Sequence, residues 1–274
     1  MVKLLNTGFT RLRKNKLFWI LVAFSIGLAL LVVYTQYRSM KIYGDTIEAE
    51  QLMLNYATVI GVVIAIFTSL FLGVEYSDGA IRNKISVGHR RIHIYVSNFV
   101  IITVTSLFSY IVFTAVVSFI GIPLFGAITI PISKLLMLLG CIFVTIVAYS
   151  SIFTFIAMAI QNKAVTATVS IMLAFSLMMA ALTCLKILQA QEYTPITSIR
   201  NGEIVTEKIK NPKYPSEMEK EIYQAFLNLN PAGQMFQLAG RTAPDLKVLP
   251  VYSLGIFLVF TTAGIVLFHK KDLK

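Results

Sequence analysis

The chain has 274 residues, 57% of them hydrophobic and only 14% charged, with a formal net charge of +11 and a mean hydropathy of +0.76. Soluble domains are usually about 45–50% apolar and about 25% charged, so this composition excludes an ordinary soluble domain and indicates an integral membrane protein. The two cysteines, Cys141 and Cys184, lie in apolar runs and give neither a disulfide framework nor the spacing of a metal site.

The first segment, residues 1–16, contains five Lys or Arg residues and no acid. Its apolar residues Leu5, Phe9 and Leu12 stand at i, i+4 and i+7, which places them on one face of a helix. We therefore predict an amphipathic interface helix that lies on an anionic membrane surface. A signal peptide is the alternative, but the apolar run that follows is long for one and no small-residue cleavage site stands after it.

Six apolar runs follow. A helix needs about 20 largely apolar residues to cross a bilayer. The predicted spans are Leu17–Tyr34, Tyr56–Val74, Phe99–Ile120, Leu135–Ile160, Val165–Ile187 and Leu249–Phe268. The sequence thus predicts an all-α membrane protein, with spans one to five in residues 17–187, an outer loop at 188–248, a sixth span at 249–268 and a tail at 269–274.

The distribution of Lys and Arg predicts the orientation. With the N-terminus in the cytoplasm, the inner segments carry 13 Lys and Arg residues, whereas the short outer loops carry three, namely Arg38, Lys41 and Lys134. Short cytoplasmic loops of membrane proteins are enriched in basic residues. The positive charge is therefore explained by topology rather than by nucleic-acid binding, and both termini are predicted to be cytoplasmic in a multi-pass protein of the cell membrane.

A polar segment, residues 75–98, lies between spans two and three. Ser77 or Asp78 can cap the start of a helix, and Gly88 can end one in the left-handed conformation. We predict a short helix from Gly79 to Val87 between them.

That helix would carry the apolar pair Ile81 and Ile85 at i, i+4, flanked by Arg82 and Lys84. An exposed helix of this kind can insert its apolar pair into a groove on a soluble partner. The alternative is a simple connector whose basic side chains reach the headgroups.

Glu75 stands at the inner end of the second span, where an acid is costly unless it is solvated or paired. We predict an ion pair with Arg82, or with Arg90 or Arg91 if the chain folds back.

The outer loop begins with a polar stretch, 189–215, that contains prolines. Ser216 and Glu219 then have the spacing of a capping box, which predicts a helix through about Leu229. The following segment Gly233–Gly240 is apolar but too short to span, so we predict an interfacial or re-entrant piece.

Several kinds of chemistry find no support in the sequence. No span core contains an Asp, Glu, Lys, Arg or His, which argues against proton relays and membrane-embedded catalysis. There is no phosphate-binding P-loop, and no cofactor is predicted. His89 and His93 have i, i+4 spacing, but Arg90 and Arg91 follow the first histidine and would repel a cation, so no metal site is predicted.

Two sequence patterns resemble those of a known family. The run Gly73-Val74-Glu75-Tyr76-Ser77-Asp78-Gly79-Ala80-Ile81-Arg82, followed by Gly88-His89-Arg90-Arg91, resembles the segment after the second span of ABC-2 type permeases, the membrane subunits of ABC exporters. Asn230-Pro231-Ala232-Gly233-Gln234 resembles the N-P-x-G-Q element before the last span of such proteins. The number of spans and the large outer loop agree with the family.

The resemblance implies that 78–87 is a cytoplasmic coupling helix that docks in a separately encoded ATP-binding-cassette subunit. The residues implied in this contact are Asp78, Gly79, Ile81, Arg82, Ile85, Gly88 and Arg90. The segment Gln161, Asn162 and Lys163 would make a second contact. Two permeases, identical or different, would stand side by side in the bilayer.

The function implied is export of an amphipathic substrate, such as a peptide antibiotic, without bond chemistry in this chain and with no nucleic-acid partner. Two alternatives remain open. One is an ion-efflux permease of the same family, which acids along the pathway would favour. The other is a non-transporting scaffold or sensor that holds a cytoplasmic partner.

Overall fold

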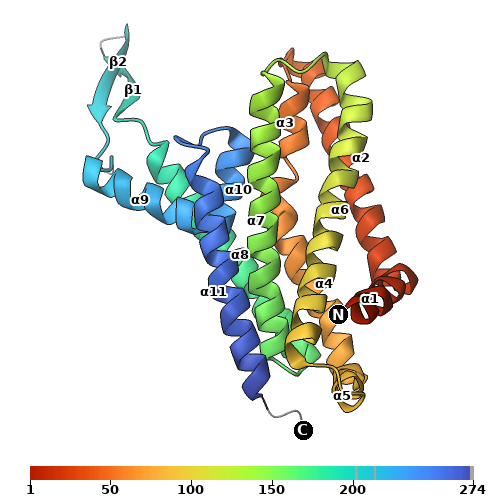
Figure 1. The fold of residues 1–274 in the computed structure, drawn as a ribbon. Coiled ribbons are helices and arrows are strands. Elements are labelled where there is room, and N and C mark those ends of the chain that lie inside the picture. Colours follow the sequence, from red (N-terminus) through yellow and green to blue (C-terminus); the bar gives the residue numbers. More distant parts are fainter. Residues whose placement is uncertain (201–202, 213, 272–274) are drawn as a thin grey trace.

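The computed structural model describes residues 1–200, 203–212 and 214–271. Long helices stand side by side in one bundle, a helix crosses the bundle near one end, and a β-hairpin projects from the other end (Figure 1). Both termini lie toward the same end, which we call the termini end, and the opposite end is the hairpin end. Residues 272–274 of the predicted tail lie outside the described residues.

Within the residues that the structure describes, six helical segments are long and apolar enough to cross a membrane. They are α2 (Lys16–Tyr43), α3 (Ala49–Leu54) together with α4 (Ala57–Ser77), α6 (Arg91–Phe125), α7 (Ile132–Ala159), α8 (Lys163–Leu188) and α11 (Val248–Lys270). The predicted all-α membrane fold with six spans is therefore confirmed. With 28 and 35 residues, α2 and α6 are about 42 and 52 Å long, so both extend beyond a hydrocarbon core about 30 Å thick.

The α4 helix lies at the centre of the bundle, because small residues let its neighbours approach closely. A Cβ added at Gly61 would stand 2.6 Å from the Tyr149 ring on α7, and one at Gly73 would stand 2.8 Å from the Lys163 side chain on α8. In a strongly apolar stretch of 18 residues, the span formed by α3 and α4 is 61% buried inside the protein, against 17% for α8. The α8 helix is therefore peripheral and turns most of its surface away from the bundle.

Three hydroxyl groups tie α2, the start of α4 and α6 together inside the bundle. Ser25 Oγ lies 3.1 Å from Tyr56 Oη and 2.8 Å from Ser109 Oγ, and Tyr56 Oη lies 2.6 Å from Ser109 Oγ. All three residues are buried. Each hydroxyl therefore finds polar partners although its residue is buried, as a buried polar group requires.

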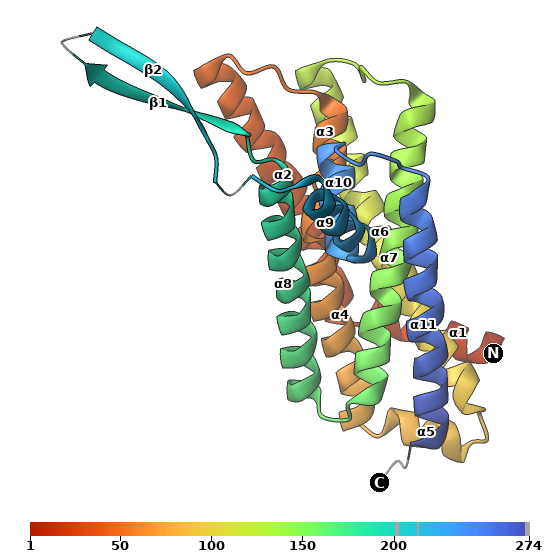
Figure 2. The same cartoon turned by 90° about the vertical axis from the view of Figure 1, so that its left-hand side faces the viewer.

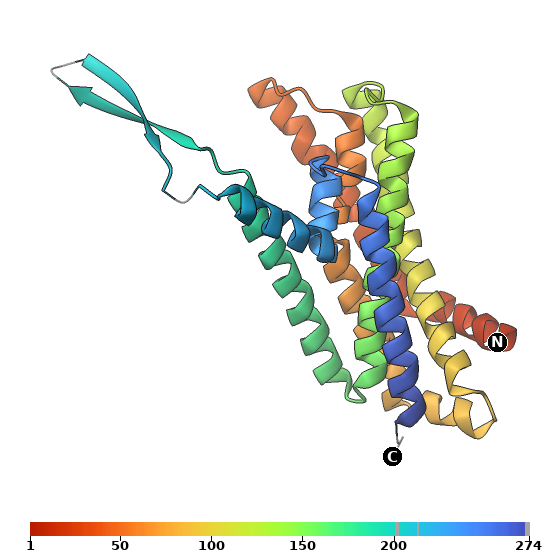
Figure 3. The same cartoon turned by 60° about the vertical axis from the view of Figure 1, so that its left-hand side comes forward.

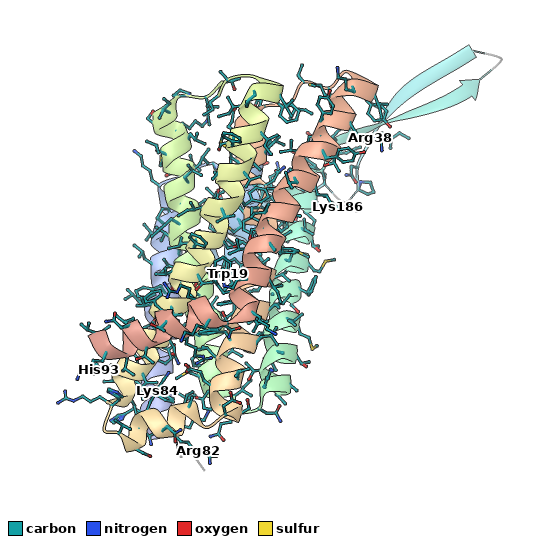
Figure 4. All side chains as sticks on the ribbon, turned by 90° about the vertical axis from the view of Figure 1, so that its right-hand side faces the viewer. Trp19, Arg38, Arg82, Lys84, His93 and Lys186 are labelled. Carbon is teal, nitrogen blue, oxygen red and sulfur yellow. The ribbon has the colours of Figure 1, made fainter. Side chains whose placement is uncertain are left out.

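The helix α1 (Val2–Lys14) crosses the bundle at the termini end (Figure 4). Its buried residues are Leu4, Gly8 and Leu12, and a Cβ at Gly8 would stand 2.1 Å from the Ile101 side chain of α6. The predicted helix is thus present. Its buried stripe is centred on Gly8 rather than on Leu5 and Phe9, which are only half-buried, because Gly8 permits the close contact with α6.

The loop between α8 and α11 contains a feature that the sequence analysis did not predict. Strands β1 (Tyr193–Arg200) and β2 (Glu203–Lys210) pair antiparallel, with Tyr193 opposite Lys210, and extend away from the bundle (Figure 3). They occupy much of the stretch described above as polar.

The remainder of the loop is helical. The helix α9 (Glu217–Leu229) starts with the predicted capping box, in which the Ser216 N–H donates to Glu219 at 2.8 Å. The helix α10 (Pro231–Gly240) is buried almost throughout and packs against α4, α7, α8 and α9. The short apolar segment is therefore a buried helix at the hairpin end.

Candidate functional site

The segment 75–98 contains the end of α4, a short helix and the start of α6. The α4 helix continues through Ser77, Asp78 ends it, and Gly79 turns the chain in the left-handed conformation with φ 68°. The short helix α5 (Ala80–Ser86) follows, and Gly88 ends the turn with φ 90°, as predicted. The prediction that Ser77 or Asp78 caps α5 is wrong, because both still belong to the end of α4.

Glu75 is the centre of a buried polar cluster at the termini end, which we call the Glu75 cluster. Its side chain is 2% exposed and forms ion pairs with Arg11 of α1 and with Lys84 of α5, the latter at 2.7 Å. The Asn98 amide of α6 donates to its second oxygen at 3.0 Å. One carboxylate therefore connects α1, α4, α5 and α6.

The predicted partners of Glu75 were different. Arg82 is exposed and lies on the far side of α5 from Lys84 (Figure 4). In the described part of the chain the ion pairs of Glu75 are with Arg11 and Lys84, not with Arg82, Arg90 or Arg91. The reason is geometric: the turn at Gly79 directs Lys84 back toward the end of α4, whereas Arg82 points outward.

Arg11 is the residue of this cluster that sequence reasoning missed. Besides Glu75 it donates to the carbonyl oxygen of Phe71 at 2.8 Å, and its guanidinium lies 4.4 Å from the centroid of the Phe71 ring. Arg11 thus combines an ion pair, a hydrogen bond and a cation–π contact on α4. These contacts fix the crossing helix α1 to the central helix of the bundle.

Further cations hold the ends of α7 and α11 at the termini end. Arg91 donates to carbonyls of the last turn of α11 at 3.0 and 3.1 Å. The Lys271 ammonium donates to the carbonyls of Met158 and Ala159 at 3.0 and 2.9 Å, and burial lowers the pKa of this lysine. Tyr76 also donates to Met158, at 2.8 Å. Cations at helix C-termini are favourable, since the last carbonyls lack partners within the helix.

The apolar pair of α5 does not face outward. Ile81 is 1% exposed and belongs to the core, and Ile85 is half-buried. The exposed residues of α5 and its following turn are Arg82, Asn83, Ser86, Val87 and Gly88, and Val87 is 77% exposed. The expectation that the isoleucines form a protruding pair is therefore corrected: they anchor α5 to its own bundle. Among the other predicted contact residues, Asp78, Gly88 and Arg90 are exposed and Gly79 is half-buried.

The second predicted contact segment lies beside the first. Asn162 accepts hydrogen bonds from the N–H groups of Ala164 and Val165 at 2.9 and 3.2 Å and so caps α8. Gln161, Asn162 and Lys163 line a shallow pocket of about 500 Å³, and Ser77 at the end of α4 lines it too. The second segment therefore lies beside Ser77, the residue directly before Asp78, at the termini end.

At the hairpin end, the Asn-Pro-Ala-Gly-Gln run builds the start of α10. Asn230 accepts from the N–H of Ala232 at 2.9 Å and donates to the Leu177 carbonyl of α8 at 2.8 Å. Gln234 is fully buried, and its oxygen accepts from Thr145 of α7 at 3.0 Å and from Ser253 of α11. Two amide side chains thus attach α10 to three spans.

The comparisons with known proteins agree with this architecture. The family model described as ABC-2 family transporter protein matches residues 4–181, which include most of α1, the first four spans, most of the fifth span and the whole Glu75 cluster. No curated protein matches the chain. Because the family match extends over well more than half of the chain, the protein belongs to the ABC-2 transporter family and is a membrane permease of that family.

Proposed function

We propose that this permease is the membrane subunit of an ATP-driven exporter and that α5 couples it to a separately encoded ATP-binding subunit. The observation that carries the proposal is the attachment of α5 to three other helices through the Glu75 carboxylate. The buried Ile81 adds an apolar anchor. Because α5 is held at these points, a displacement of α5 is passed on to the helices that it contacts.

In this mechanism, ATP binding closes two partner subunits, and α5 moves with them. Lys84 and Glu75 pass the movement to α4, and Arg11 and Asn98 pass it to α1 and α6. Packed helices switch between discrete arrangements, so a small displacement at one end can alternate the access of a pathway. Two permeases side by side complete that pathway, and the chemistry of ATP hydrolysis stays in the partner.

The proposal places the termini end in the cytoplasm, because the basic segments 1–16 and 75–98 lie there. The exposed residues Arg82 and Val87, together with Asp78 and Arg90, would then face the ATP-binding subunit. The pocket lined by Gln161, Asn162 and Lys163 would form the second part of the same contact.

The cargo proposed is amphipathic, because the cores of the predicted spans carry no Asp, Glu, Lys, Arg or His. At the hairpin end a pocket of about 700 Å³ is lined by Glu48 and Arg241. Arg241 pairs with Glu48 and lies 3.7 Å from the buried Glu50. Arg241 balances one of these two charges, and Glu50 also accepts from the N–H and the hydroxyl of Thr129, so both acids already have partners within the protein.

The exposed surface of α5 provides a test. We expect Arg82→Glu combined with Val87→Asp to lower the amount of ATP-binding subunit that co-purifies in detergent by about tenfold or more, which corresponds to roughly 1.4 kcal/mol. The substitution reverses one charge and removes one exposed apolar group, and it leaves Ile81 and the Glu75 cluster intact. The measurement is the ATPase activity and the identity of the co-purified subunit.

The matched control is Lys134→Glu with Ile132→Asp, an equivalent exposed pair at the hairpin end. It should leave co-purification unchanged. If an ATP-binding subunit co-purifies equally with the wild type and with the α5 variant, coupling does not run through this surface. If no such subunit accompanies the wild type, the scaffold alternative takes first place.

A further inference from the structure

A groove of about 630 Å³ lies between α8 and α11. In Figure 2 these helices stand on either side, with α9 crossing between them at the hairpin end. The groove is lined by residues of α7 to α11. Those that matter below are Leu173 and Leu177 of α8, Phe226 and Leu229 of α9, and Gly255 and Val259 of α11. It is a site apart from the α5 surface and the Glu75 cluster.

The lining is apolar and carries no charge. Asn230 is the amide among the lining side chains, and it is already engaged with the Leu177 carbonyl and with the N–H of Ala232. The groove therefore offers dispersion contacts rather than polar recognition, which suits a hydrocarbon chain and disfavours a polar or ionic ligand.

The dimensions of the groove match one half of a bilayer. Its wall on α11 runs from Val251, near the end of that helix at the hairpin end, to Phe260. Nine residues of helix rise about 14 Å, and half of a hydrocarbon core about 30 Å thick is about 15 Å. The groove thus extends over about the depth of one leaflet.

The α9 helix supplies the upper boundary. Its residues Met218, Ile222, Phe226 and Leu229 share one face and are 73%, 61%, 42% and 58% exposed. Phe226 and Leu229 also line the groove, so the apolar face of α9 continues directly into it. A helix with an uncovered apolar face that crosses the spans lies in the interface plane of the membrane.

We propose that this groove binds an acyl chain of a membrane phospholipid. The groove opens to the hydrocarbon region, and leaving it empty would forfeit the contacts of its walls. The groove carries no charged side chain and extends over about the depth of one leaflet, which match the chemistry and the length of an acyl chain. An extended hydrocarbon chain is only roughly 4–5 Å wide by van der Waals contact, and it fits. This inference does not depend on the exporter proposal.

Gly255 makes the groove testable, because a side chain there enters free space. A Cβ at Gly255 meets no atom within 4 Å, so the first carbon of the Gly255→Phe side chain enters the groove without a clash. Gly27 of α2 is the matched control, since it is also exposed in a span with nothing within 4 Å of an added Cβ, and it lies outside the groove. Both substitutions replace a helical glycine, which helix propensity favours.

The experiment uses the full chain in phosphatidylcholine vesicles that contain a trace of phosphatidylcholine with a photoreactive acyl chain. Labelled peptides are located by mass spectrometry. Lipid tails are as apolar as leucine, so an acyl chain prefers the groove to the rest of the lipid-facing surface only because of its fit in shape. We therefore expect a modest excess of labelling in the groove. We expect Leu173, Leu177 and Val259 to be labelled about threefold more than the lipid-facing Ile20 and Leu31 of α2, and Gly255→Phe, but not Gly27→Phe, to remove the excess.

Two results would overturn the proposal. Equal labelling of the groove and of α2 would mean ordinary surrounding lipid only. A groove without label, together with a disulfide between copies formed by Gly255→Cys, would mean that a second permease covers it. Neither result bears on whether an ATP-binding subunit docks at α5.

Discussion

Glu75→Gln is expected to lower the melting temperature of the detergent-purified permease by about 5–10 °C. The carboxylate is 2% exposed, and its removal leaves Arg11 and Lys84, themselves 29% and 21% exposed, without their anion. Removing one partner of a buried ion pair is costly, and with partly exposed cations we expect about 2–4 kcal/mol. For a chain of this size each kcal/mol corresponds to about 2–4 °C. Thermal unfolding followed by circular dichroism measures the change.

Asp78→Asn is the control for this prediction, because Asp78 is an exposed acid three residues further along. Its effect should stay within about 0.5 kcal/mol, as for most surface changes. Arg11→Met tests the pairing itself. If the two residues interact, the loss in the double variant with Glu75→Gln is smaller than the sum of the single losses. A Glu75→Gln protein as stable as the Asp78→Asn protein would contradict the central place given to this carboxylate.

Gly233→Ala is expected to destabilise the hairpin end by about 3 kcal/mol. A Cβ at this position would stand 2.5 Å from the carbonyl oxygen and 2.8 Å from the Cα of Leu227. Both atoms belong to the backbone, so no side-chain rotation relieves the overlap, and α10 has to move away from α9. Overpacking of this kind costs about 1–3 kcal/mol or more. Proteolysis of the loop between α8 and α11 and thermal unfolding report the change.

Gly240→Ala in the same helix is the matched control. The nearest atoms to an added Cβ there are 3.5 Å away in Thr242, which is ordinary contact. Alanine is favoured over glycine in a helix by about 0.5–1 kcal/mol, so this variant should be equal to or slightly more stable than the wild type. Equal stability of the two alanine variants would show that the close approach at Gly233 does not constrain α10.

The sequence predicted the features that depend on local pattern. Six apolar runs became six spans because length and composition decide membrane insertion. The capping box at Ser216 formed because its hydrogen bonds connect residues three apart. The left-handed turn at Gly88 formed because glycine adopts that conformation without strain.

Features that depend on distant contacts were not predicted correctly. Because burying a carboxylate is costly, Glu75 is expected to pair with a cation. Its partner Arg11 is 64 residues away, and nothing in the sequence pattern distinguishes Arg11 from the other four basic residues in 1–16. Likewise, the spacing of Ile81 and Ile85 predicts an apolar face but not what covers it. Their own bundle covers it, and the exposed residues of this segment include Arg82, Asn83 and Val87.

The hairpin was missed for another reason. The stretch 189–215 is polar and contains proline, which obscures a strand pattern. Nevertheless, β-branched residues are frequent on both strands, and the dipeptide Asn201-Gly202 stands between the two strands in the sequence, which is a strong signal for a two-residue hairpin. That dipeptide therefore predicts the hairpin.

The amide groups of α10 constrain the order in which the chain is assembled during synthesis. Gln234 takes its partners from α7 and α11, and Asn230 takes one from α8. A buried amide side chain without hydrogen-bond partners costs several kcal/mol of stability. Burial of α10 is therefore unfavourable until the spans that supply its partners are in place. Since α11 follows α10 in the chain, the hairpin end closes only after α11 has been synthesised, whereas α1, α4 and α5 at the opposite end can meet earlier.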